Sequence, residues 1–209
     1  MALGASGVAT FRIFSSELMT GGGAFEYPGG DNQTLSFADR SNPISNRSIR
    51  YFWNGQPANP GGTGSFAGFT LIDTPSESTY ASTPGRNLGK FGYTKITFYA
   101  RGSLSTRTNL KIEGADDAGR GIPVTCMTLS TDASGDECGA NGDEAGAKEE
   151  LTSGWQKYTL PIYMPTTSLT DVKDFFKATF VYDFPLGGLP GEAPGQGGTV
   201  YLDQIQYEP

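Results

Sequence analysis

GTVYLDQIQYEP (198–209) shows the alternation of apolar and polar residues that is typical of a β-strand with one buried face. Val200 and Leu202 share one face, and Ile205 and Tyr207 continue the apolar pattern one residue out of step. This shift predicts a β-bulge between Leu202 and Ile205. Asp203 lies in that interval, where a buried carboxylate is costly unless a partner compensates it. We expect this last strand to pair with the first strand of the chain.

The same alternation recurs along the chain in short segments separated by turn-forming residues. The sequence has 30 glycines and 13 prolines, and segments at this spacing are typical of a β-sandwich. We predict an all-β fold, an antiparallel β-sandwich of the jelly-roll type with about ten strands, in a single domain over residues 8–209. SLTDVKDFF (168–176) suggests a short helical turn. The expected strands are 8–15, 34–38, 47–53, 65–72, 93–101, 108–115, 122–129, 155–163, 175–183 and 199–207.

Charge and composition argue against several classes of function. Lys+Arg 15 against Asp+Glu 22 gives a net charge of −7, which disfavours nucleic acid as a partner. The apolar segments are short and interrupted by charges, so we expect no membrane span. Histidine is absent, which removes the Ser-His-Asp and Cys-His nucleophile systems and the commonest ligand of catalytic zinc. Catalysis by carboxylates alone and metals with oxygen ligands, such as calcium, remain open.

The first residues and the two cysteines bear on the compartment. MALGASG (1–7) lacks the charged and apolar regions of a signal peptide, so we expect residues 1–7 to be linker or vector-derived. Cys126 and Cys138 enclose a loop rich in turn formers, where we expect a local disulfide. Two unrelated free thiols are the alternative. A disulfide would imply an oxidising compartment.

Four segments, in this order, resemble motifs of jelly-roll carbohydrate-binding modules: NLGKFGYTKITFYARG (87–102), LTSGWQKYTLPI (151–162), SLTDVKDFFKATFVYD (168–183) and GTVYLDQIQYE (198–208). RSIRYFWNGQPANPGGTGSFAGFTL (47–71) is similar to their early strand pair around a Gly-rich loop. The likeness runs in register from about Leu35 to Glu208. Each motif alone is weakly specific, and together they resemble the galactose-binding-like modules attached to glycanases without selecting one family.

The resemblance implies either a structural calcium site at Asp203 or a role for Asp203 in capping backbone amides. By the family's habit of pairing both chain ends, the further ligands would come from Glu17, Glu26 and Asp39. The alternative is an aspartate that faces solvent at the bulge. The acidic stretch 132–150 could also coordinate calcium, but it lacks the EF-hand pattern, and we interpret it as a solvated insertion.

A sugar site needs flat aromatic rings that stack on the pyranose ring and polar groups that bind its hydroxyls. Tyr99 and Arg101 alternate with core-facing residues of 93–101 and therefore share the outer face, where the resemblance places ligand contacts on a concave sheet. A loop that covers this face is the alternative. We expect Trp155 to be a core or sheet-edge residue. Further candidates, on strands expected in the same sheet, are Arg50, Phe52, Lys177, Gln204 and Gln206. Trp53 is a secondary candidate at the loop rim, although alternation along its strand assigns it to the core.

The resemblance implies a non-catalytic, extracellular and monomeric carbohydrate-binding module. Its expected partners are a polysaccharide or oligosaccharide and a catalytic domain in the parent protein, which it would attach to a β-linked glycan. A structural or adhesive surface domain without a sugar site is the alternative from another class. A glycanase or lyase that uses only carboxylates is the third, but no strand carries the closely spaced acids that such glycanases use.

Overall fold

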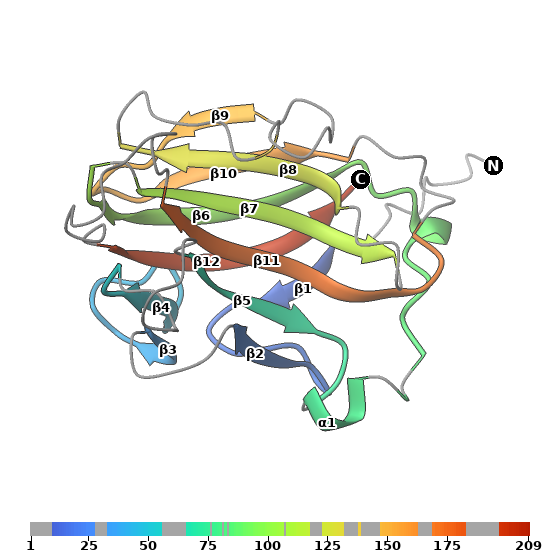
Figure 1. Cartoon of the computed structure of the whole chain (residues 1–209). Coiled ribbons are helices and arrows are strands. Elements are labelled where there is room, and N and C mark those ends of the chain that lie inside the picture. The colour runs from blue at the N-terminus through green and yellow to red at the C-terminus, as the bar shows by residue number, and fades with distance from the viewer. Residues whose placement is uncertain are drawn as a thin grey trace.

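The computed structural model describes residues 10–27, 33–55, 66–75, 77–80, 82, 84–106, 108–117, 123–131, 138, 147–162, 169–182 and 197–209. These residues form two six-stranded sheets (Figure 1). Sheet A has the strand order β10-β6-β12-β4-β3, with β1 paired to β12, and sheet B has the order β2-β5-β11-β7-β8-β9. The pairs are antiparallel except for β8 with β9. The predicted antiparallel β-sandwich is confirmed.

Each sheet combines strands from the beginning, the middle and the end of the chain. Sheet A contains β1 (Phe11–Phe14), β3 (Gln33–Asp39), β4 (Ser48–Trp53), β6 (Lys95–Leu104), β10 (Gln156–Pro161) and β12 (Gly198–Glu208). Sheet B contains β2 (Gly23–Tyr27), β5 (Phe66–Ile72), β7 (Thr108–Asp117), β8 (Pro123–Ser130), β9 (Ala147–Glu150) and β11 (Val172–Tyr182). Two short helical segments, α1 (Glu77–Tyr80) and η1 (Gly89–Phe91), lie between β5 and β6. Within the described ranges, no helix is long and apolar enough to cross a membrane.

Three local predictions need correction. β2 was not expected, because its first residue belongs to the Gly-rich run 21–23, which reads as a turn. β9 was not expected, because the acidic stretch reads as an insertion. The helical turn at 168–176 is wrong, since residues from Val172 onward belong to β11. A register shift between Asp174 and Phe176 buries the consecutive residues Phe175 and Phe176, and this break in alternation resembles a helical pattern.

The core lies between the sheets and is rich in aromatic side chains. Tyr51 of β4 stacks on Phe180 of β11 with ring centroids 5.0 Å apart, and it meets Phe69 of β5 edge-on at 5.1 Å. Tyr207 of β12 donates a hydrogen bond of 3.0 Å to the carbonyl of Phe175 in the opposite sheet. Each such ring contributes about 1.5–3 kcal/mol through burial, so these contacts hold the two sheets together.

Strand β12 behaves as its sequence predicts. Its pairing with β6 shifts register between Asp203 and Gln206, which confirms the bulge. Gln204 adopts a φ of 50° there, a left-handed conformation that lets the apolar pattern change phase. β1 pairs antiparallel with the end of β12, as expected. The bulge therefore determines which residues of β12 face outward on each side of it.

Candidate functional site

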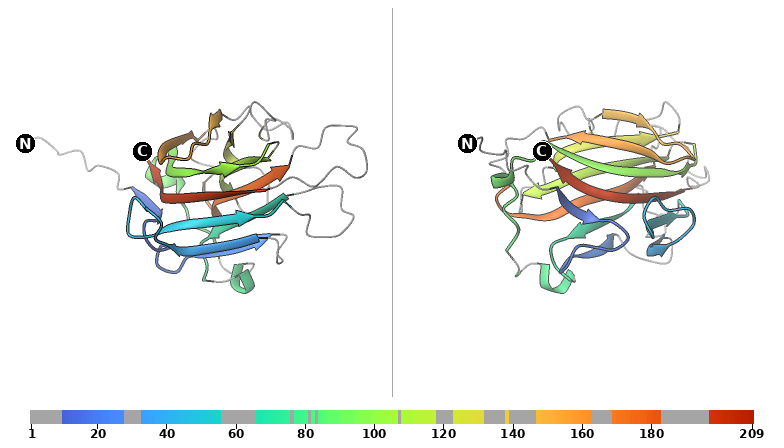
Figure 2. Two further views of the ribbon diagram at one scale, coloured as in Figure 1. Left: turned by 90° about the vertical axis from the view of Figure 1, so that its left-hand side faces the viewer. Right: turned by 180° about the vertical axis from the view of Figure 1, so that it is seen from behind.

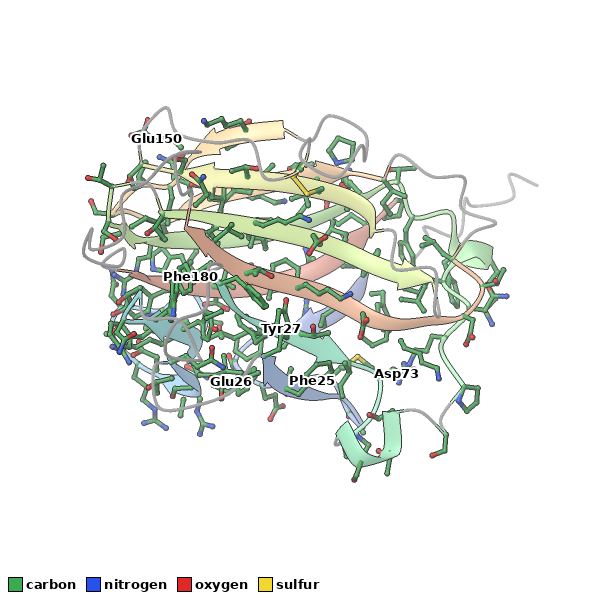
Figure 3. All side chains as sticks on the ribbon, in the orientation of Figure 1. Phe25, Glu26, Tyr27, Asp73, Glu150 and Phe180 are labelled. Carbon is green, nitrogen blue, oxygen red and sulfur yellow. A yellow bond between two sulfur atoms is a disulfide. The ribbon has the colours of Figure 1, made fainter. Side chains whose placement is uncertain are left out.

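The outer face of sheet B carries a groove of about 580 Å³. It combines apolar rings at one end with charged and hydroxyl side chains further along. Figure 3 labels two of the rings, Phe25 and Tyr27, at β2 on the edge of the sheet. The lining residues are Phe25, Tyr27, Phe66, Thr70, Lys111, Glu113, Asp174, Lys177, Thr179 and Val181.

Strand register aligns one row of these side chains across the groove. Phe25 of β2 lies opposite Thr70 of β5, Thr70 opposite Lys177 of β11, and Lys177 opposite Glu113 of β7. Since neighbouring strands are about 4.8 Å apart, the row extends over roughly 14 Å. It begins with an aromatic ring and ends with paired charges.

A second row runs parallel to the first, two residues further along each strand. Tyr27 lies opposite Gly68, Gly68 opposite Thr179, and Thr179 opposite Lys111. A Cβ at Gly68 would come within 2.6 Å of the Tyr27 ring, so the ring lies against the backbone of β5. The hydroxyls of Tyr27 and Thr179 share a hydrogen bond of 2.7 Å. Burial raises the pKa of the Tyr27 hydroxyl, which keeps it protonated at physiological pH. Its ring is thus held in a fixed orientation.

The charged residues of the groove occur as ion pairs. Lys111 Nζ lies 3.0 Å from Glu113 Oε1, and Lys177 Nζ lies 3.1 Å from Asp174 Oδ2. The second oxygen of Asp174, Oδ1, is buried and accepts no hydrogen bond from the described residues. Both pairs are mostly buried, so their geometry is restrained. Together they offer donors and acceptors side by side, as hydroxyl recognition requires.

The disulfide borders the same face. Cys126 and Cys138 are bonded, which confirms the predicted pairing. Cys126 lies opposite Glu113 in the register of β8 with β7, so it faces outward beside the groove. Cys138 is fully buried and accepts a hydrogen bond of 3.6 Å from Thr128 Oγ1. The disulfide therefore fixes the chain at Cys138 against the outer face of sheet B.

The residues first expected to bind sugar lie mainly on the opposite sheet. Tyr99 and Arg101 are on the outer face of sheet A, and both are half-buried. The Arg101 guanidinium lies 3.9 Å from the centre of the Tyr201 ring and 5.2 Å from that of Trp155. It also donates to the carbonyl of Ser41 in the β3–β4 loop. Arg101 thus fixes this loop, which agrees with the alternative that a loop covers the outer face of this sheet.

The other residues proposed for that face have different environments. Arg50 lies on β4 with its guanidinium 5.8 Å from the centre of the Phe52 ring. Trp53 is only 1% exposed and belongs to the core, so its placement at the loop rim is wrong. Lys177 lies in sheet B, so its assignment to the sheet of Tyr99 is also wrong. Strand alternation defines which residues of a strand face outward, but it does not define to which of the two sheets that strand belongs.

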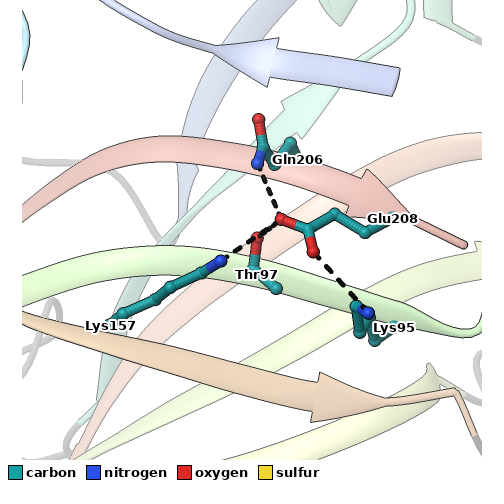
Figure 4. A network of polar contacts seen from close by, with 5 residues as sticks. All are labelled: Lys95, Thr97, Lys157, Gln206 and Glu208. Atoms are coloured by element: carbon teal, nitrogen blue, oxygen red, sulfur yellow. Dashed lines mark hydrogen bonds and ion pairs between the residues drawn. The ribbon is translucent and has the colours of Figure 1, made fainter. Parts of the chain in front are cut away.

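Gln206 belongs to a polar network centred on Glu208 (Figure 4). Glu208 Oε1 accepts hydrogen bonds from Thr97 Oγ1 at 2.7 Å and Gln206 Nε2 at 2.8 Å. Lys157 and Lys95 approach the carboxylate at 3.4 and 3.7 Å. The hydrogen bond from Thr97, above all, lowers the pKa of Glu208. The network joins β12, β6 and β10, and it gives Gln206 a role within the sheet.

Asp203 caps a loop. It is fully buried, and its Oδ2 accepts a hydrogen bond of 2.8 Å from the backbone N–H of Ser45. Its Oδ1 accepts bonds of 2.8 Å from the Ser45 hydroxyl and from the backbone N–H of Gln204. This is the capping role that the sequence left open beside calcium binding, and it excludes an aspartate facing solvent.

The proposed calcium ligands are not brought together. Glu26 lies on β2 in sheet B, Glu17 precedes β2, and Asp39 ends β3 in sheet A, where it accepts a hydrogen bond from the backbone N–H of Ser41. In the part of the chain that the structure describes, no three acidic, histidine or cysteine side chains could hold a metal ion together. The oxygens of Asp203 also accept protein hydrogen bonds. This set of residues therefore does not fit a calcium site.

Sequence reasoning missed most of the groove. Phe25, Tyr27 and Phe66 were not proposed, although Phe66 is 47% exposed. The available signal was GAFEY (23–27), whose two aromatic residues alternate as on one strand face, but the adjacent turn formers obscured it. On sheet A, Trp155 directly precedes the edge strand β10, in agreement with the expected sheet-edge position, and its Nε1 donates a hydrogen bond of 2.6 Å to the carbonyl of Asn42.

Comparison with known proteins supports the fold. No model of a protein family matches the sequence, and no curated protein matches it. Among solved structures, the family 11 carbohydrate-binding module from Clostridium thermocellum, in complex with a β-1,3-1,4-mixed-linked tetrasaccharide, superposes with a TM-score of 0.50 at 12% identity over 97% of each chain. The sandwich is that of carbohydrate-binding modules.

Two further structures have the same fold. The extra C-terminal domain of an exo-1,3/1,4-β-glucanase from a Pseudoalteromonas species gives a TM-score of 0.56 at 8% identity, over 95% of this chain and 93% of that domain. The family 30 carbohydrate-binding module of a cellulosomal cellulase of Clostridium thermocellum gives 0.50 at 11% identity, over 95% and 96% of the two chains. The fold expected from the sequence motifs is thereby confirmed.

Proposed function

We propose that this protein is a non-catalytic module that binds a β-linked glycan in the groove on the outer face of sheet B. The observation that carries the proposal is the combination of aromatic rings and ion-paired side chains in one groove of about 580 Å³. Pyranose rings stack on aromatic faces, and their hydroxyls need donors and acceptors at fixed positions. The groove offers both within two aligned rows of residues.

Binding would divide between the two ends of the groove. Phe25, Tyr27 and Phe66 provide apolar surface for the C–H faces of sugar rings. Lys111, Glu113 and the Lys177–Asp174 pair provide hydrogen-bond donors and acceptors for hydroxyls. Because each ammonium already lies beside a carboxylate, the described charges of the groove balance. This favours a neutral sugar, and no covalent bond is made or broken.

The proposal includes attachment to a polysaccharide-degrading enzyme outside the cell. Two observations support it. A disulfide is maintained in oxidising compartments and is rare in the cytosol. Among the proteins of the same fold is an extra C-terminal domain of an exo-1,3/1,4-β-glucanase. The module would hold its enzyme close to the glycan and so raise the local substrate concentration.

Affinity gel electrophoresis with soluble β-glucans, mannans and uronates tests the function, and Phe66→Ala tests the site. Phe66 is 47% exposed, so its removal costs little stability but deletes a stacking surface. We expect about tenfold weaker retardation, since a stacked ring contributes about 1–2 kcal/mol. Phe91→Ala removes an aromatic ring of similar exposure, 41%, at η1 and serves as the matched control.

Tyr99→Ala distinguishes the two faces of the sandwich. Tyr99 lies on sheet A, so we expect this variant to bind glycan as the parent does. If Tyr99→Ala loses binding and Phe66→Ala does not, the site is on sheet A and the groove assignment is wrong. If no glycan retards the parent protein, the alternative of a structural or adhesive domain is favoured. Release of reducing sugars from any of the glycans would contradict the non-catalytic assignment.

A further inference from the structure

The arginines of the described residues are distributed unevenly. On sheet B and at the adjoining loops, three cations are ion-paired: Lys111, Lys177 and Arg86 each lie within 3.1 Å of a carboxylate oxygen. On the sheet A side, Lys95 and Lys157 share Glu208. Five arginines on the sheet A side differ, because no described carboxylate lies within 4.0 Å of their guanidinium groups, and one of them, Arg101, holds the β3–β4 loop. Four others remain. They are Arg12, Arg40, Arg47 and Arg50.

These arginines surround the β3–β4 loop, residues 40–47. Arg12 lies opposite Gln206 in the pairing of β1 with β12, and Arg50 lies opposite Tyr201 in the pairing of β4 with β12. Arg40 and Arg47 are the two ends of the loop, and both are exposed. The right-hand view of Figure 2 shows β10, β6 and β12 of this sheet from behind, with β1 and the β3–β4 hairpin beside β12.

A pocket of about 370 Å³ opens between this loop and the turn after β1. Its described lining residues are Ser16, Glu17, Arg40, Asn46 and Arg47. The backbone N–H of Asn46 donates a hydrogen bond of 3.0 Å to Ser16 Oγ, which joins the two walls. The pocket thus places two exposed guanidinium groups and an amide side chain around one cavity, with Glu17 as the acid among its lining residues.

The loop that carries these side chains is held in place. Asp203 accepts hydrogen bonds from Ser45, Arg101 donates to Ser41, and Trp155 donates to the carbonyl of Asn42. These contacts come from β12, β6 and the residue before β10, so the loop is fixed across sheet A. Arg40 and Arg47 are therefore presented from a supported backbone, which lowers the entropy cost of binding a ligand.

We propose that this arginine surface (Arg12, Arg40, Arg47 and Arg50) is a second binding site, for a polysaccharide that carries carboxylate groups. The chain as a whole has a net charge of −7, so unpaired arginines on one side of it form a local region of opposite sign. The edge of a guanidinium matches the two coplanar oxygens of a carboxylate. Arg50 lies over the Phe52 ring, which leaves that edge for a ligand.

The spacing of the cations selects among acidic polymers. Arg50 and Arg12 lie opposite residues 201 and 206 of β12, which places them roughly 15 Å apart along the strand. Nucleic acid carries a phosphate about every 3.4 Å along each strand, so its charge is much denser than that of guanidinium groups roughly 15 Å apart. A polyuronate carries one carboxylate per sugar, and the Phe52 ring beside Arg50 can contact the sugars between.

The test measures binding of polygalacturonate at low ionic strength by isothermal titration calorimetry. We expect binding that weakens with salt and is about tenfold weaker in Arg47→Gln/Arg50→Gln, since each lost charge-assisted contact is modest at an exposed site. Lys90→Gln/Lys148→Gln removes the same charge at η1 and β9, and it should bind as the parent does. Arg47→Lys/Arg50→Lys should bind with intermediate affinity, because lysine lacks the planar fork.

Several results would overturn the proposal. The first is that polygalacturonate does not bind to the parent protein. The second is that Lys90→Gln/Lys148→Gln loses as much polygalacturonate affinity as Arg47→Gln/Arg50→Gln. The third is that dextran sulfate or single-stranded RNA binds to the parent as tightly as polygalacturonate or more tightly. The four arginines have no described ion pair to lose, so the variants should keep the parent's melting temperature. Binding of neutral β-glucan should be unchanged by these substitutions and lowered by Phe66→Ala, so the two sites succeed or fail separately.

Discussion

Replacement of Asp203 by alanine should destabilise the protein by about 3–4 kcal/mol. The carboxylate is fully buried and accepts hydrogen bonds of 2.8 Å from the Ser45 amide, the Ser45 hydroxyl and the Gln204 amide. A hydrogen bond to a charged acceptor contributes about 1.5–3 kcal/mol, and a buried donor left without an acceptor costs about 1–3 kcal/mol. Removal of the charge also removes its desolvation cost, so the net loss is smaller than the sum of these contacts.

Two further variants separate the contributions of the individual hydrogen bonds to this loss of stability. Ser45→Ala removes one hydroxyl donor but leaves the backbone N–H of residue 45 bonded to Asp203, so we expect a loss of about 1 kcal/mol. Asp203→Asn keeps one acceptor oxygen and turns an amide group toward the remaining donors, and its loss should lie between the other two. Urea denaturation at constant slope gives the three free energies of unfolding. A loss below about 1 kcal/mol for Asp203→Ala would refute the capping argument.

The same variants test the calcium hypothesis. A metal bound only by the folded state stabilises it by mass action, so a chelator would lower the melting temperature of the parent protein. We expect the chelator to have no effect through Asp203, because its oxygens already accept hydrogen bonds from Ser45 and Gln204. If chelator destabilises the parent and not Asp203→Ala, the carboxylate binds the metal after all, as the sequence motif also allowed.

Two other perturbations have defined outcomes. The pKa of Glu208 is lowered in the folded state, so its contribution to stability is present above the ordinary glutamate pKa and is lost as pH falls through the lowered value. The difference in melting temperature between the parent and Glu208→Gln should therefore shrink on acidification, and a constant difference would contradict this. Cys126→Ser/Cys138→Ser opens a loop with a sequence separation of 12 and should lower the free energy of unfolding by about 3 kcal/mol in urea. An unchanged midpoint would show that the unfolded chain is not restricted by the disulfide.

The core was predictable from the sequence because alternation is a local signal. Ile96, Phe98, Leu110, Ile112 and Phe180 were all assigned inward from their own strands, and each is fully buried. The bulge in β12 was also predictable, because a change of phase between two apolar pairs needs only the residues of that strand. Sequence patterns of period two therefore define inward and outward residues where turn formers do not interrupt them.

The site was less predictable because it depends on which strands become neighbours. Tyr99 and Lys177 both face outward, as alternation indicates, but β6 and β11 belong to different sheets. The order of strands in a jelly roll is set by pairings between residues far apart in the chain, and the 2.7 Å hydrogen bond between Tyr27 and Thr179 spans 152 positions. No local pattern places Tyr27 beside Lys177 and Lys111. The set of residues on one face of a sheet can be derived from the sequence only after it is known which strands form that sheet.

Side-chain chemistry alone also does not separate a ligand site from an internal contact. Arg101 between Trp155 and Tyr201 has the composition of a sugar subsite, but its guanidinium binds the protein's own Ser41 and fixes a loop. Lys177 has a similar polar setting, yet it faces a groove with exposed aromatic surface at Phe66. The difference is whether the hydrogen-bonding and stacking positions around the cation are taken up by the chain itself. On sheet A both kinds of position are taken up at Arg101, whereas at Arg50 the described residues occupy only the stacking position, through the Phe52 ring. A ligand on that face would therefore contact the residues beside the loop that Arg101 holds.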